Sequence, residues 1–129
     1  MFSHIMVGAN DIEASKIFYD EVLGVLGAEP GIMVPNLTGQ KRYFYFLEDM
    51  TFCISEPING EKATHGNGST IGFNVTDEGM GDAWHAAGLE NGGISIEDAP
   101  GIREFEGMKM YLAYLRDPSG NKLCAIKRM

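Results

Sequence analysis

The alternation of apolar and polar positions along the first half of the chain predicts a strand, a helix and three further strands. Residues 3–8 have the pattern of a short strand, and apolar side chains recur at helical spacing from residue 14 to residue 26. Strands are expected near residues 31–34, 42–47 and 51–56, because these runs are rich in aromatic and β-branched residues. Asn10 and Glu13 are spaced as a capping box at the start of the helix. The predicted order is βαβββ.

The second half repeats this order after a polar stretch that ends at Gly68. Acidic Asp77 and Glu78 stand where a second helix should begin, and Gly92-Gly93 should end it. Strands are expected at residues 69–76, 94–97, 108–115 and 121–127. We therefore predict an α+β fold made of two pseudo-symmetric βαβββ modules, in halves of about residues 1–58 and 67–129.

Side-chain parity divides the predicted strands into two faces. One phase of the alternation is apolar and should lie under the helices; it contains Ile5, Val7, Phe52, Ile54, Ile71, Phe73, Val75, Leu123 and Ala125. The other phase is polar with little charge, as expected for the lining of a cavity, although a partly solvated sheet face would also fit. Its members give the candidate pocket residues: His4, Met6, Thr51, Cys53, Ser55, Thr70, Asn74, Lys122 and Cys124. Parity does not decide which residues of the run Tyr43–Phe46 point inward.

Composition narrows the classes of partner. The 129 residues suit one domain, residues 1–129, and the net charge of -8 argues against binding to nucleic acid or an anionic membrane. A neutral or cationic ligand fits better. No apolar run is long enough to span a membrane, and the start has no signal-peptide pattern. Cys53 and Cys124 form no CxxC pattern, so we expect reduced thiols and a cytoplasmic protein.

Two segments resemble one known family. The first segment is HIMV at residues 4–7 leading to ASKIFYDEVLG at residues 14–24, and the second is RDPSGNKLC at residues 116–124. They resemble the first and last parts of proteins of the vicinal oxygen chelate superfamily. That superfamily contains glyoxalase I, bleomycin-resistance proteins and extradiol dioxygenases. The resemblance covers nearly the whole chain. It implies a curved mixed sheet that forms a cup with helices on its outer face, and it makes a homodimer the expected assembly.

The resemblance also implies where a metal would be bound. Metal-dependent members use a His, a Glu, a second His and a second Glu on four strands, and the equivalent positions here are His4, Cys53, Thr70 and Cys124. Only the first ligand is retained. Glyoxalase-type proton transfer needs carboxylates at the metal, and non-haem iron requires two His and one carboxylate. Dioxygenase activity is therefore not expected.

Three hypotheses about function remain open at this stage. The first is a glyoxalase/bleomycin-resistance-like protein that binds a small molecule without cofactor or metal, and for which no catalytic residue can be named. The second is a glyoxalase-like lyase or isomerase with zinc or nickel on His4, Cys53 and Cys124 or nearby Glu56. The third is a protein-interaction module that uses exposed strand edges. Each Cys could also be an apolar filler or a reactive thiol, and His65 lies close enough in sequence to reach the pocket rim.

Overall fold

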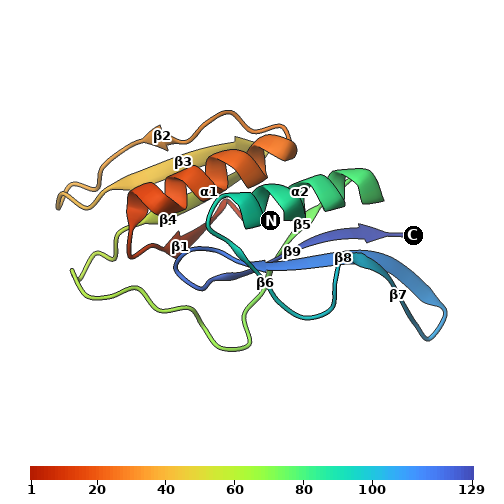
Figure 1. The fold of residues 1–129 in the computed structure, drawn as a ribbon. Helices are drawn as coiled ribbons and strands as arrows, with labels where there is room; N and C mark the ends of the chain where they lie inside the picture. Colours follow the sequence, from red (N-terminus) through yellow and green to blue (C-terminus); the bar gives the residue numbers. More distant parts are fainter.

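The computed structural model describes residues 1–129 and contains the two predicted series of elements (Figure 1). The first half consists of β1 (His4–Gly8), α1 (Ile12–Val25), β2 (Ile32–Met33), β3 (Arg42–Leu47) and β4 (Met50–Ser55). The second half consists of β5 (Ile71–Asn74), α2 (Glu78–Glu90), β6 (Ile94–Ser95), β7 (Gly101–Phe105), β8 (Met108–Arg116) and β9 (Lys122–Arg128). The βαβββ order and the α+β class are confirmed. Strand β7 is an addition that the alternation did not predict.

The strands form two mixed sheets, one in each half. Their orders are β1-β4-β3-β2 and β5-β9-β8-β6, and β7 pairs with β8. In each sheet the first strand runs parallel to the last: Ile5 pairs with Phe52, and Ile71 pairs with Leu123. The first members of these pairs are 66 residues apart (71 − 5) and the second members 71 (123 − 52). The internal repeat thus extends to the register of the strands.

The apolar phase of the strands faces the helices, as predicted. Phe52, Ile54, Leu123 and Ala125 are buried in one core with both helices, and Ile5, Val7, Ile71 and Phe73 pack against it. Tyr43 and Tyr45 belong to this core as well, which leaves Phe44 and Phe46 on the opposite face of the sheet. Each helix lies over the sheet of its own half, and the two helices run next to each other (Figure 1). Neither helix is long and apolar enough to cross a membrane.

The cap of α1 differs from the prediction by one residue. Asp11, not Asn10, is the N-cap, and its carboxylate accepts a hydrogen bond from the backbone N–H of Ala14. The Asn10 side chain instead donates to the carbonyl of Ala63 and accepts from its N–H. In α2 the predicted acidic start is confirmed, because Asp77 caps the helix through the N–H of Met80.

A buried polar network ties the turn between β8 and β9 to the first half. Tyr19 of α1 donates to the Asp117 carboxylate at 2.6 Å, and Asn121 donates to the same carboxylate and to the carbonyl of Gly8. Asn10 reaches the turn too, through its N–H and the hydroxyl of Ser119. We call these contacts the latch. The corresponding hairpin of the first half, residues 47–50, makes no hydrogen bond to the second half.

Candidate functional site

The predicted pocket residues of each half lie side by side on the face of the sheet that the helices leave open. On the first sheet, the parallel register sets His4 beside Thr51, Met6 beside Cys53 and Gly8 beside Ser55. On the second sheet, Lys122 and Cys124 are on β9, and Gly72 of β5 is the partner of Cys124. Thr70 precedes β5 rather than belonging to it, because the strand is shorter than predicted. The strand register thus sets these residues on one face of each sheet, and their role in binding a ligand stays a prediction.

These residues differ in how much of them solvent can reach. His4, Met6, Thr70 and Asn74 are exposed, and Thr51 and Lys122 are half-buried. Cys53, Ser55 and Cys124 are buried. Among the predicted residues, the accessible ones therefore offer imidazole, thioether, hydroxyl, amide and ammonium groups, most of which can hydrogen-bond a ligand.

A cavity of about 340 Å³ begins on the open face of β1 and extends to the turn before β9. Of the predicted residues it contains Met6 and Lys122. Its full lining is Met6, Val7, Gly8, Thr64, His65, Gly66, Ser69, Ile71, Asn121 and Lys122. His65 reaches this rim, and its ring lies so close to Gly120 that a Cβ there would be 2.7 Å from Nδ1. Ser69 and Asn121 were not among the predicted pocket residues, because each began a predicted strand in the phase assigned to the helix-facing side; in the structure both residues precede their strands.

Lys122 is the only lysine or arginine in this cavity, and its charge is already compensated. Its ammonium group pairs with the carboxylate of Glu97, and it lies 5.0 Å from the centre of the Tyr114 ring. Glu97 has left-handed backbone geometry, with φ of 57°. An anionic ligand in this cavity would therefore have to compete with Glu97 for the lysine.

Both cysteines are free thiols in surroundings that keep them protonated. Burial raises the pKa of Cys53 above its ordinary value, with Arg42 opposing the shift. Burial also raises the pKa of Cys124, against the opposing effect of Lys122. A thiol with a raised pKa is a weak nucleophile at neutral pH. The small-filler interpretation of the cysteines is favoured over the reactive one.

The residues at the four metal positions do not fit the metal that the family resemblance implies. No three or more His, Cys, Asp or Glu side chains are grouped so that they could hold an ion, and this includes His4, Cys53 and Cys124. His4 is hydrogen-bonded to the neighbouring Ser3 hydroxyl. Glu56 accepts a hydrogen bond from the Lys41 N–H and lines a separate hollow with Asn10 and Lys62. The four positions together offer one imidazole, two thiols and one hydroxyl, and they lack the carboxylates that the family's metal site uses.

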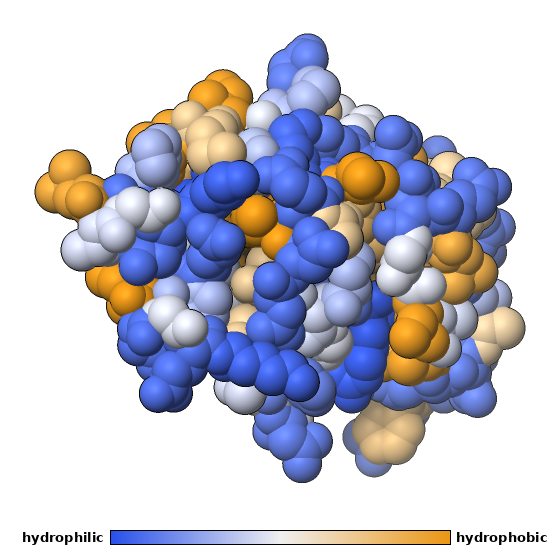
Figure 2. All heavy atoms as spheres, turned by 60° about the vertical axis from the view of Figure 1, so that its left-hand side comes forward, coloured by the Kyte–Doolittle hydropathy of each residue, from blue (hydrophilic) through white to orange (hydrophobic).

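The outer surface is mostly hydrophilic on the face that Figure 2 shows. Figure 2 shows a face on which hydrophilic side chains predominate, while hydrophobic ones form small separate groups and line the bottom of a hollow. With 18 acidic and 10 basic residues, such a surface is unfavourable for polyanions.

A known family and a solved structure of high sequence identity both match the whole or nearly the whole chain. The sequence profile described as the Glyoxalase/Bleomycin resistance protein/Dioxygenase superfamily matches residues 1–125. A glyoxalase/bleomycin resistance protein from Albidiferax ferrireducens is 56% identical, with a TM-score of 0.88, covering 100% of this chain and 99% of that one. No curated protein matches the chain.

More distant solved structures share the fold alone. A glyoxalase/bleomycin resistance protein/dioxygenase family enzyme from Burkholderia phytofirmans has 16% identity, a TM-score of 0.71 and coverage of 98% of both chains. A fosfomycin resistance protein, FosX, from Listeria monocytogenes has 16% identity and a TM-score of 0.73, covering 100% of this chain and 94% of that one.

Proposed function

This chain belongs to the glyoxalase/bleomycin resistance protein/dioxygenase superfamily, and from that premise we propose that it binds a small organic molecule on its open sheet faces without a metal. The proposal rests on the residues that occupy the four positions at which metal-dependent members of the family bind their metal. They hold His4, Cys53, Thr70 and Cys124, which form no metal-binding group. What remains is a surface of small hydrogen-bonding groups beside a cavity of ligand size.

The expected ligand is neutral or cationic. The chain carries a net charge of -8, and the lysine of the open-face cavity is paired with Glu97. Long-range attraction therefore favours a cation, and that cavity has no unpaired lysine or arginine to bind an anion. The two free thiols also suit the reducing cytoplasm that we propose as its location.

We further propose a homodimer in which the open faces are shared. Met6 and Phe46 lie on the open face of the first sheet and are 43% and 57% exposed, which is costly for large apolar side chains. A second copy that covers this face would bury them and enclose the ligand. Size-exclusion chromatography with light scattering should give twice the mass of 14.1 kDa. A purely monomeric protein at micromolar concentration would contradict this proposal.

Ligand binding is tested by thermal stabilisation. A panel of cationic antibiotics, glutathione adducts and neutral aromatic compounds should contain members that raise the melting temperature. A ligand at a hundred times its Kd stabilises the folded state by about 2.7 kcal/mol. Met6→Arg, in the open-face cavity, should abolish the shift, whereas Ile17→Arg, on the exposed side of α1, should retain it. If no compound stabilises the protein, or if both variants respond equally, the open face is not the binding site.

The lyase alternative is separated from simple binding by two measurements on the same protein. Elemental analysis of freshly purified protein and of Cys124→Ser tests for a bound metal. Turnover of the methylglyoxal–glutathione hemithioacetal with added zinc or nickel tests for the reaction. Binding without either result supports the metal-free proposal, and one metal per chain that is lost in the variant would support the lyase.

A further inference from the structure

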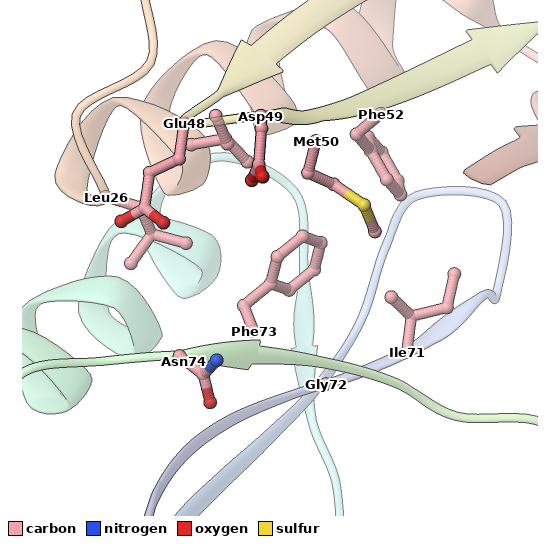
Figure 3. A pocket seen from close by; sticks show the side chains of 10 residues that line it. Leu26, Glu48, Asp49, Met50, Phe52, Ile71, Gly72, Phe73 and Asn74 are labelled. Carbon is pink, nitrogen blue, oxygen red and sulfur yellow. The ribbon is translucent and has the colours of Figure 1, made fainter. Parts of the chain in front are cut away.

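A second cavity, of about 300 Å³, lies where the two halves meet (Figure 3). Its walls come from the end of α1, the β3–β4 hairpin and strand β5. The lining residues are Leu26, Leu47, Glu48, Asp49, Met50, Phe52, Ile71, Gly72, Phe73 and Asn74. Of the predicted pocket residues it contains only Asn74, and His4, Cys53 and Cys124 are not part of it. The two cavities share Ile71 and no other lining residue.

The internal repeat explains why this cavity exists. The β3–β4 hairpin and β5 line one cavity, and the turn before β9 and β1 line the other. The two cavities therefore occupy equivalent positions in the two repeats. Gly72 and Met6, one from each cavity, are separated by the repeat spacing of 66 residues (72 − 6). On the β1 side the latch binds the turn to the other half. On the β5 side the hairpin makes no hydrogen bond across the gap. This side of the junction is left open.

The cavity combines an apolar floor with an acidic rim. The rings of Phe52 and Phe73 meet edge to face at 5.5 Å, and Figure 3 shows the Phe73 ring rising from β5 toward Met50 and Phe52. Glu48 and Asp49, at the hairpin turn, are exposed and make no hydrogen bond or ion pair with their carboxylates.

No charged group of the cavity offsets these two carboxylates. None of the lining residues is a lysine, arginine or histidine. The Phe73 ring adds an aromatic face, which attracts cations. A ligand that satisfies all of these features has a positive charge joined to a compact apolar body.

We propose that this cavity is a binding site for small organic cations, with the ammonium group between Glu48 and Asp49 and the apolar body against Phe73, Met50 and Leu26. The volume is at the lower end of the roughly 300–1,000 Å³ of ligand pockets, which suits a single-ring amine. Because the ligand touches both halves, it would bridge the side of the junction that the latch does not hold. This site is independent of any ligand on the open faces.

Three matched probes test the charge preference: phenethylammonium, phenethyl alcohol and hydrocinnamate, which share the phenylethyl body and are positive, neutral and negative. Calorimetry on the intact protein should show the ammonium compound binding most tightly and losing affinity as salt is raised. The double variant Glu48→Gln/Asp49→Asn should weaken it by about fivefold or more. Equal affinity for the three probes would overturn the proposal.

The position of binding has its own readout. With methionine methyl groups labelled, the ammonium probe should shift the Met50 signal, assigned by Met50→Leu, and leave the Met6 signal of the other cavity unchanged. Glu106→Gln is the matched control, because Glu106 also has a left-handed backbone in a hairpin turn but lies outside the cavity. A probe that shifts Met6 instead, or that binds the double variant as well as the wild type, places the site elsewhere and refutes the proposal.

Discussion

Replacing Asp117 with alanine is expected to lower the free energy of unfolding by about 3 kcal/mol or more. The Asp117 side chain is 3% exposed and accepts hydrogen bonds from the Tyr19 hydroxyl, the Asn121 side chain and the N–H groups of Ser119 and Asn121. Alanine would leave several buried donors unpaired, at about 1–3 kcal/mol each before water or rearrangement compensates. Urea unfolding followed by circular dichroism measures the change.

The internal repeat provides the control for this variant. Asp49 is in the corresponding hairpin of the first half, is exposed and makes no side-chain hydrogen bond, so Asp49→Ala should change stability by about 0.5 kcal/mol or less. Tyr19→Phe removes one hydroxyl of the latch and should cost less than Asp117→Ala. Burial, followed by the charge of Asp117, raises the pKa of Tyr19 well above its ordinary value, so its hydroxyl remains a donor at neutral pH. Equal stability of Asp117→Ala and Asp49→Ala would show that the latch contributes nothing.

Gly81→Ala is expected to destabilise the protein by about 1–3 kcal/mol, although alanine is the better helix former. A Cβ at Gly81 would lie 2.0 Å from Cε1 of Tyr111 and 2.7 Å from its hydroxyl oxygen. The Tyr111 ring is 1% exposed and its hydroxyl donates to Asp82, so it cannot move aside without breaking a contact. Helix α2 would have to shift away from β8. Thermal or urea unfolding measures both the sign and the size of this change in the free energy of unfolding.

Gly24→Ala is the matched substitution in α1. Nothing lies within 4 Å of a Cβ placed there, so only the helix propensity changes, and the variant should gain about 0.5–1 kcal/mol. The two glycine variants should therefore move stability in opposite directions. If Gly81→Ala were also stabilising, the close contact between α2 and Tyr111 would be wrong.

Most of the fold could be predicted because it depends on local periodicity. Parity assigned Phe52, Ile54, Leu123 and Ala125 to the helix-facing side, and all of them are in the core. Strand β7 was missed because its five residues, GIREF, contain two charges and a glycine and pair only with β8. The cap was misplaced by one residue because Asn10 and Asp11 are both good cap residues, and the contact of Asn10 with Ala63 decides between them.

Less of the candidate site than of the fold could be predicted from the sequence. Parity gave the residues of the open faces, but it could not show that Lys122 is paired with Glu97, since Glu97 lies beyond the end of β6, in the irregular segment before β7. The latch and the cavity at the hairpin of Glu48 both depend on how the two halves pack against each other. This packing produces no periodic pattern of apolar and polar residues in the sequence. Asp117 and Tyr19 are 98 residues apart, a separation at which only the folded chain relates them.

The latch also sets an order of events while the chain is being made. Asn121 reaches back 113 residues to the carbonyl of Gly8, and Ser119 reaches back 109 residues to Asn10. A ribosome releases β1 and α1 long before the turn that completes their hydrogen bonds has been translated, so the Tyr19 hydroxyl has no carboxylate partner during that interval. These polar groups of the early half must therefore stay hydrated until residues 117–121 have been made and have folded back onto it.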